Sequence, residues 1–209
     1  DGDDDHKKLP YMSNAFINLS PLEDNDNNKA NYLGEVYGAG QGRDGDRRGD
    51  KMQDFSYVLV DMPNTETFKD AVVFGAGSYN GVGMRQKVEP NAATSVKDQA
   101  SAVVDLINGK IRAAYGGSYK QGITRRTVVN VPAASTININ NIFGGAYGTL
   151  ILPPCDVYET NVNYKNTSEK ARVTGAIYGG NNNERRSIYT HVNISSPVWS
   201  NKEKGYLGT

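Results

Sequence analysis

The sequence predicts an all-β protein, namely a right-handed parallel β-solenoid of about five irregular coils with a mobile acidic N-terminal segment. Three observations predict this fold: an aromatic–glycine motif that returns five times, an Asp/Asn motif that keeps step with it, and β-branched runs between the two. With 209 residues, the chain has the length of one domain of ordinary size or one large all-β unit.

The first 30 residues differ in composition from the remainder of the chain. They hold seven acidic residues against three lysines, and the opening Asp-Gly-Asp-Asp-Asp has no apolar partner that would fold it. The apolar residues between Tyr11 and Leu22 suffice for one short strand or a cap on the body. We therefore expect an acidic tail and cap strand over residues 1–30 and a solenoid repeat domain over residues 31–209.

The glycine motif consists of an apolar residue, an aromatic residue, glycine and a second small residue. Its first glycines are 37, 41, 28 and 35 residues apart. The copies are Val36-Tyr37-Gly38-Ala39, Val73-Phe74-Gly75-Ala76, Ala114-Tyr115-Gly116-Gly117, Ile142-Phe143-Gly144-Gly145 and Ile177-Tyr178-Gly179-Gly180. The final Gly205-Tyr206-Leu207-Gly208 matches the residues that lead into the first copy. We therefore expect this chain to be truncated from a longer array, with a sixth copy starting just beyond Thr209.

The second motif is an apolar–Asp/Asn–apolar triplet inside a β-branched run. Its copies are Val60-Asp61-Met62, Val104-Asp105-Leu106, Val129-Asn130-Val131, Val162-Asn163-Tyr164 and Val192-Asn193-Ile194. The Asp/Asn lies 14, 11, 14 and 16 residues before the next first glycine, whereas the distance from a glycine to the next Asp/Asn varies from 14 to 30 residues. The steady part predicts a strand–turn–strand core, and the variable part predicts a loop after the glycine motif.

Stacking explains why such a sequence would repeat. One unit of 28–41 residues cannot bury its own apolar face, but stacked units can. We expect the motif aromatics to point inward and stack, the glycines to serve a positive φ or a close backbone approach, and the Asp/Asn residues to form an amide column. Two alternatives stay open, an antiparallel two-sheet sandwich and a helix over Ser101–Ile107.

The aromatic–glycine motifs at residues 36–38, 73–75, 115–117, 143–145 and 178–180, separated by Val/Ile/Thr/Asn runs, resemble those of Gly-rich parallel β-helix repeat proteins on the outer surface of Bacteroidetes. The acidic opening is similar to the stretch that follows the lipidated cysteine of exported lipoproteins in that phylum. The resemblance implies a β-helix, a location that is extracellular or at the outer-membrane surface, and a lipid anchor upstream of residue 1. It implies no reaction.

Composition and charge exclude several classes of protein. Lys+Arg and Asp+Glu both number 23, so no net charge attracts nucleic acid. The apolar runs are too short for a transmembrane segment. A single cysteine, Cys155, forbids an internal disulfide, and two histidines argue against a His-rich zinc site. We find no phosphate-binding loop and no nucleophile motif, and we expect no cofactor.

One pair of acidic residues deserves a chemical interpretation. The repeat register places Asp61 and Asp105 on adjacent coils, about 5 Å apart, where they would share a proton or bind Ca²⁺ through oxygen ligands. The alternative is that both belong to the Asp/Asn column, so we treat them as weak metal candidates and expect no catalytic residue. The loop Gly42–Asp50 also alternates acidic residues, but its interleaved arginines argue against a cation site.

Arginine pairs give the binding hypothesis. Three pairs follow glycine motifs, and in register they would form a stripe along one edge of the solenoid that recognises carboxylate, sulfate or phosphate. The alternative is charge placed there for solubility and against lateral strand pairing. The candidate binding residues are Arg47, Arg48, Arg125, Arg126, Arg185 and Arg186.

These observations favour a non-enzymatic structural or adhesive module of a cell surface, with an acidic polysaccharide or a cell-surface glycan as partner. The alternative is a carbohydrate-active enzyme of β-helix type, either a polysaccharide lyase or a glycosidase, which would use paired carboxylates. An acidic groove that interrupts the repeat would distinguish the enzyme from the module. The near-uniform columns of the repeat favour the module.

Overall fold

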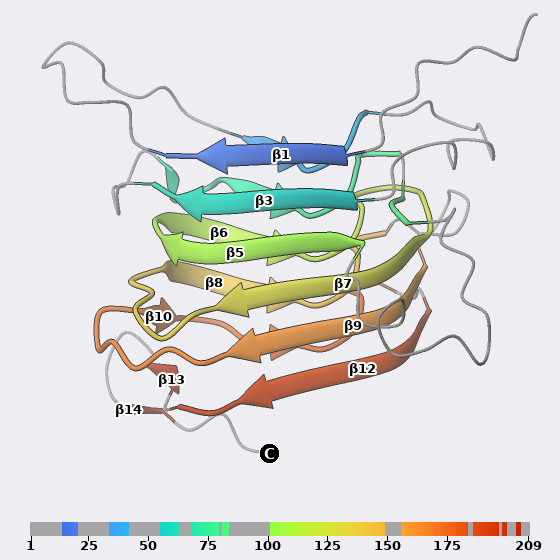
Figure 1. The fold of residues 1–209 in the computed structure, drawn as a ribbon. Helices are drawn as coiled ribbons and strands as arrows, with labels where there is room; N and C mark the ends of the chain where they lie inside the picture. Colours follow the sequence, from blue (N-terminus) through green and yellow to red (C-terminus); the bar gives the residue numbers. More distant parts are fainter. Residues whose placement is uncertain are drawn as a thin grey trace, which may run out of the picture.

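The computed structural model describes residues 14–20, 34–41, 55–62, 68–79, 81–83, 101–148, 156–183, 186–196, 198–199 and 204–205. The strands in these ranges form two large parallel sheets. The chain alternates between the sheets, and each new strand pairs with the strand that was added to the same sheet one round earlier (Figure 1). We call one strand of the first sheet, together with the part of the second sheet that follows it, a pass.

The first sheet has six strands in the order β1-β3-β5-β7-β9-β12. Their bounds are Asn14–Leu19 for β1, Phe55–Asp61 for β3, Ala102–Asn108 for β5, Thr124–Val131 for β7, Val157–Tyr164 for β9 and Ser187–Ile194 for β12. The strand β1 pairs with β3 in parallel along its whole length, so this short strand from the N-terminal region extends the first sheet.

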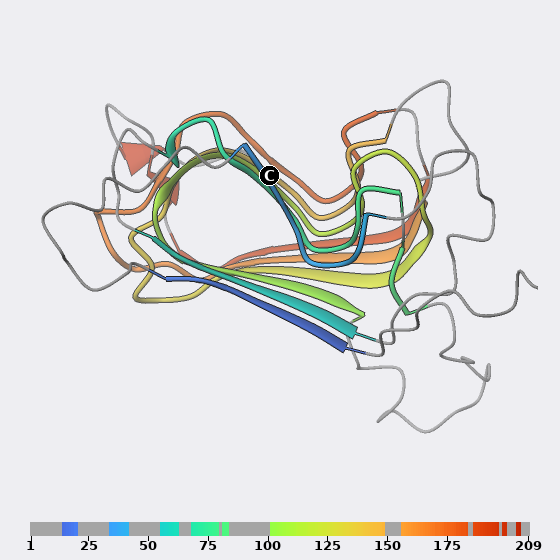
Figure 2. The ribbon, with the colours of Figure 1, turned by 90° about the horizontal axis from the view of Figure 1, so that it is seen from above.

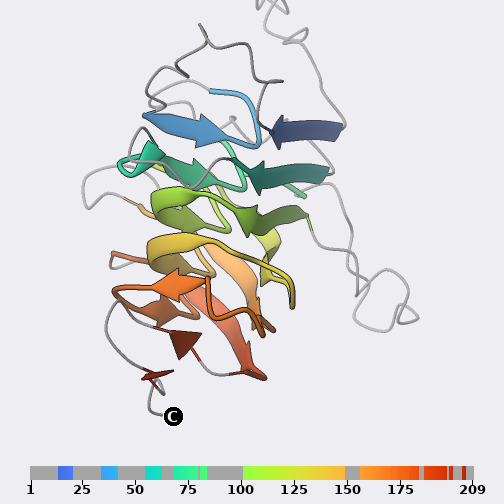
Figure 3. The same ribbon diagram turned by 90° about the vertical axis from the view of Figure 1, so that its left-hand side faces the viewer.

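The second sheet has the order β10-β8-β6-β4-β2, and β11 also pairs with β8. Its strands are β2 (Glu35–Tyr37), β4 (Val72–Phe74), β6 (Lys110–Tyr115), β8 (Asn138–Phe143), β10 (Arg172–Val173) and β11 (Ile177–Tyr178). A separate antiparallel pair joins β13 (Val198–Trp199) to β14 (Lys204–Gly205). Seen from the side, the passes lie one above another (Figure 3).

The predicted all-β fold with parallel strands is confirmed. The antiparallel sandwich is wrong, because every pairing within the two large sheets is parallel. The helix over Ser101–Ile107 is also wrong, because that segment forms β5, whose side chains alternate between buried and half-buried positions. Alternation with a period of two is typical of a strand that packs one of its faces against a core.

The main core fills the space between the two sheets. Register places Val58, Val104, Val129 and Val162 side by side on successive strands of the first sheet, and all four are fully buried. They pack in one cluster with apolar residues of the second sheet, including Val73, Ala114 and Ile142. Parallel pairing in register therefore turns the apolar positions of the repeat into continuous rows.

The motif aromatics form the predicted column, but they lie on the opposite side of the second sheet from the one we expected. Successive rings are stacked at centroid distances of 5.2, 5.0, 4.6 and 4.6 Å, with interplanar angles of 3–12°. The column comprises Tyr37, Phe74, Tyr115, Phe143 and Tyr178. All of these rings except the exposed Tyr178 pack in a cluster separate from the main core. Strand alternation explains this, because Val73 faces the core and Phe74 must then face outward.

The first glycine of the first four motifs serves a close approach between neighbouring backbones, the second of the two expected roles. A Cβ on Gly116 would lie against the carbonyl oxygen of Gly144 in the next pass and 2.7 Å from Thr127 Cβ in the first sheet. The carbonyl of Gly144 also accepts a hydrogen bond of 2.5 Å from the Thr127 hydroxyl. In the described chain, positive φ occurs instead at Gly83, Gly109, Gly122 and Gly148. Figure 2, viewed along the stack, shows the second sheet bending toward the first before the chain turns away.

Candidate functional site

The outer face of the first sheet carries the predicted amide column. Asn130 Nδ2 donates to Asp105 Oδ1 at 2.7 Å, Asn163 Nδ2 donates to Asn130 Oδ1 at 3.0 Å, and Asn193 Nδ2 donates to Asn163 Oδ1 at 2.9 Å. Each asparagine thus donates to the previous pass, and the residue it meets there accepts through a side-chain oxygen. A hollow of about 370 Å³ adjoins this column and is lined by Asp105, Asn130, Asn163 and Lys165, among others.

The expected Asp61–Asp105 pair is not formed. Asp105 lies opposite Leu59, and Asp61 lies opposite Asn108, because the register shifts between Val60 and Asp61. Asp105 belongs to the amide column, whereas Asp61 lies outside it. The two carboxylates therefore do not form the adjacent pair that would share a proton or hold Ca²⁺.

Asp105 has a second donor, the hydroxyl of Tyr57, at 2.7 Å from Oδ2. Burial raises the pKa of Tyr57 to about 12, and the hydrogen bond to Asp105 adds to this rise. The phenol therefore keeps its proton at neutral pH and donates it to the carboxylate. With both oxygens engaged, Asp105 acts as a structural acceptor.

The arginine pairs are described only in part, because Arg47, Arg48 and Arg185 lie outside the described residues. Arg125 and Arg126 lie within β7, and Arg186 directly precedes β12. The Arg126 guanidinium pairs with Glu159 at 3.2 Å, and the Arg125 guanidinium lies 5.9 Å from the ring centre of Tyr158. The six-arginine stripe stays a prediction. The sequence features Asp1–Asp5, Gly42–Asp50 and Cys155 also lie outside the described residues.

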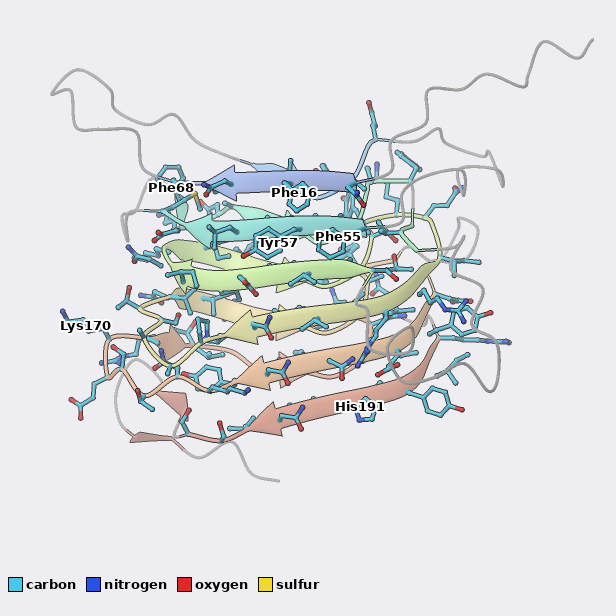
Figure 4. All side chains as sticks on the ribbon, in the orientation of Figure 1. Phe16, Phe55, Tyr57, Phe68, Lys170 and His191 are labelled. Atoms are coloured by element: carbon cyan, nitrogen blue, oxygen red, sulfur yellow. The ribbon has the colours of Figure 1, made fainter. Side chains whose placement is uncertain are left out.

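Three aromatic side chains, of which Phe16 is exposed and two are half-buried, gather at one end of the first sheet. The ring centre of Phe16 lies 5.7 Å from that of Phe55 and 6.4 Å from that of Tyr57, and the Phe16 side chain is 71% exposed. Figure 4 shows the three rings together on this face, with His191 farther down the same sheet.

The outer face of the second sheet is hollowed. Two tyrosines that follow the glycine motifs lean over the aromatic column: Tyr119 lies 5.1 Å from Phe74, and Tyr147 meets Tyr115 edge-on at 5.7 Å. Beside them lies a groove of about 280 Å³, which we call the tyrosine groove. It is lined by Glu35, Val72, Phe74, Arg112, Ala113, Tyr115, Tyr119, Asn140, Asn141 and Tyr147.

A bulge in the neighbouring pass fixes the amides of this groove. The Ala176 N–H donates to Asn141 Oδ1 at 3.0 Å, and the Thr174 hydroxyl donates to Asn140 Oδ1 at 3.1 Å. Only glycine fits at position 175, because a Cβ there would lie 2.6 Å from Asn140 Oδ1 and closer still to Asn141 Oδ1. With both oxygens used, the two side chains present their NH₂ groups as donors.

Charge is distributed unevenly along the tyrosine groove. Glu35 accepts a hydrogen bond of 2.5 Å from the Tyr37 hydroxyl, which with burial raises the pKa of Tyr37 well above its ordinary value. Burial raises the pKa of Tyr115 to about 12, although the Arg112 charge opposes that rise. Arg112 is exposed and lies on the pass that follows Phe74. One end of the groove is therefore anionic, and its middle is cationic.

Sequence reasoning missed the tyrosine groove. The available signal was a second aromatic residue shortly after the glycine motif, seen in Tyr115-Gly116-Gly117-Ser118-Tyr119 and Phe143-Gly144-Gly145-Ala146-Tyr147. The second pass varies this theme, with Tyr79 five residues after Phe74. The Tyr79 hydroxyl accepts a hydrogen bond of 3.0 Å from Lys120 Nζ, which links this second-pass tyrosine to the loop of the third pass.

In comparisons with known proteins, no family model, no curated protein and no solved structure matches the chain. Within the described ranges, no helix is long and apolar enough to cross a membrane. The same ranges contain no group of three or more His, Cys, Asp or Glu side chains placed to hold a metal ion.

Proposed function

We propose that the chain is a section of a right-handed parallel β-solenoid that serves as a non-enzymatic structural or adhesive module at a bacterial cell surface. Figure 1 supports the winding: strands of the first sheet point left in front, strands of the second sheet point right behind, and each pass lies below the previous one. Crossover connections between parallel strands are almost always of this hand. The matched rows of the repeat agree with such a stack.

The engagement of the carboxylates carries the non-enzymatic part of the proposal. Asp105 accepts from Tyr57 and Asn130, and Glu159 accepts from Arg126 and, at 3.3 Å, from Asn161. A glycosidase needs one carboxylic acid and one carboxylate placed on either side of a substrate. On the first sheet these groups instead hold neighbouring passes together.

An acidic glycan is the partner that we propose for this module, at an extracellular or outer-membrane surface location of the Bacteroidetes type. The glycan would be held by side chains presented pass after pass, since weak exposed contacts give useful affinity only when several act at once.

Incubation with acidic and neutral polysaccharides tests this function. We expect retention on acidic polysaccharide columns that weakens with salt, and no new reducing or unsaturated ends. Turnover that is lost on Asp105→Asn would contradict the proposal and favour the lyase or glycosidase alternative. Failure to bind any glycan or glycan-coated cell would remove the adhesive role.

A further inference from the structure

The tyrosine groove is concave and is lined by aromatic rings and polar side chains together. Phe74 and Tyr115 belong to the aromatic column, and Tyr119 and Tyr147 lean over it. Polar groups that converge on a cavity beside aromatic rings can fix the orientation of a bound small molecule.

The hydrogen-bonding groups in the middle of the tyrosine groove are donors. A guanidinium has donors and no acceptor, and the oxygens of Asn140 and Asn141 already accept from Thr174 and Ala176. Arg112, Asn140 and Asn141 therefore offer N–H groups from two adjacent passes. A ligand that satisfies them must be rich in acceptor oxygens.

The opposite lining is apolar and aromatic. Tyr119 and Tyr147 are half-buried, their ring centres are 5.3 Å apart, and both lean over the aromatic column. Such rings pack against the C–H face of a sugar, while the oxygen rim of the sugar meets the donors. Free amino acids or inorganic anions would satisfy the donors and leave the aromatic wall unused.

We infer that the tyrosine groove binds a short acidic oligosaccharide, with a uronate carboxylate on Arg112, hydroxyls on Asn140 and Asn141, and a sugar face on Tyr119 and Tyr147. This inference rests on the proposed adhesive function and names the site and the ligand class. Arg112 recognises the carboxylate through a charge-assisted fork. Glu35, at the other end, faces a hydroxyl, because a second carboxylate there would be repelled.

Calorimetric titration with a galacturonate hexamer, its methyl ester and polyglutamate tests the inference. We expect the hexamer to bind at least about 10-fold more tightly than the ester, since a charged hydrogen bond is worth about 1.5–3 kcal/mol. Arg112→Gln should remove this difference and leave the ester unaffected. Tyr119→Ala/Tyr147→Ala should weaken both saccharides.

Controls separate this site from the others. Phe16→Ala removes an exposed ring from the other sheet and should bind the hexamer as the parent chain does. Arg125→Gln/Arg126→Gln removes two charges of the predicted arginine stripe and serves to detect binding there instead. Arg112 is exposed, so Arg112→Gln leaves the fold intact, which circular dichroism checks. Hexamer binding that is unchanged in Arg112→Gln but lost in Arg125→Gln/Arg126→Gln overturns the groove and leaves the adhesive function standing. Polyglutamate binding as tight as that of the hexamer also overturns it.

Discussion

Both sheets carry aromatic side chains on their outer faces, and these side chains differ in how deeply they are buried. On the second sheet the rings are stacked on one another and covered by Tyr119 and Tyr147, so that Phe74 is 1% exposed. On the first sheet the Phe16 side chain is 71% exposed, although its ring lies near those of Phe55 and Tyr57. The same residue type therefore serves as a second core on one face and as surface on the other. Covering loops make the difference, and their tyrosines line the tyrosine groove together with polar side chains.

Truncating one ring on each face tests this contrast most strongly. Phe74→Ala should lower the free energy of unfolding by about 3–5 kcal/mol, because it removes a ring stacked on both sides and leaves a cavity. Phe16→Ala should change it by no more than about 0.5 kcal/mol. Urea denaturation followed by far-UV circular dichroism measures both. Equal losses would mean that the two faces are equally packed.

Glycine substitutions test what holds the second sheet close to the first. Gly116→Ala should cost about 3 kcal/mol, because the added methyl would meet the Gly144 carbonyl and Thr127. Gly180→Ala is the matched control within the same motif type, since the nearest atom to its Cβ would be 3.7 Å away. Thermal unfolding of the two variants should differ clearly. A Gly116→Ala variant as stable as Gly180→Ala would contradict the close approach.

The amide column stabilises the outer face of the first sheet. Asn130→Ala removes one bond to Asp105 and one from Asn163, and should cost about 1–3 kcal/mol. Asn193→Ala, at the exposed end of the column, should cost less than about 0.5 kcal/mol. Asp105→Asn keeps an acceptor for Asn130 and should fall between them. Identical urea midpoints for the first two variants would show that the column adds nothing.

A smaller effect concerns alkaline pH. The pKa of Tyr57 is raised from 10.0 to about 12, so the folded chain holds a proton that the unfolded chain releases. Its contribution to stability is therefore complete below about pH 10 and is lost as pH rises toward 12. Tyr57→Phe should flatten this decline in melting temperature between pH 9 and 12. An unchanged slope would show that Tyr57 does not contribute. Part of the decline in melting temperature should persist in Tyr57→Phe, because burial also raises the pKa of Tyr115 and Tyr119.

The sequence predicted the rows of the stack but not which way they face. A motif such as Val73-Phe74-Gly75 has two apolar neighbours, and a strand of three residues does not reveal which of them meets the core. Both are buried here: Val73 lies between the two sheets, and Phe74 is covered by the loops that carry Tyr119 and Tyr147. The positions of those loops were therefore needed to decide which of the two side chains faces the main core.

The Asp61 error has a local cause. Two overlapping triplets, Val58-Leu59-Val60 and Val60-Asp61-Met62, have apolar flanks, but only the second has the Asp/Asn centre of the second motif. The structure uses the first, with apolar Leu59 opposite Asp105. A register shift of this kind depends on backbone pairing across passes, which spacing along one chain does not encode. The tyrosine groove escaped prediction for the same reason, because its donors and rings come from different passes.

Between the glycine motif and the next strand of the first sheet, the chain tolerates great differences in length. Between the first glycine of each motif and the next strand of the first sheet, 16, 26, 7, 12 and 7 residues intervene along the chain. Strand pairing sets the register on either side, and lengthening a closed loop costs only about 0.6 kcal/mol per doubling. This corner is therefore a natural insertion point. A foreign peptide grafted there would be displayed on one edge of the stack at chosen heights, with the ladders on both sides undisturbed.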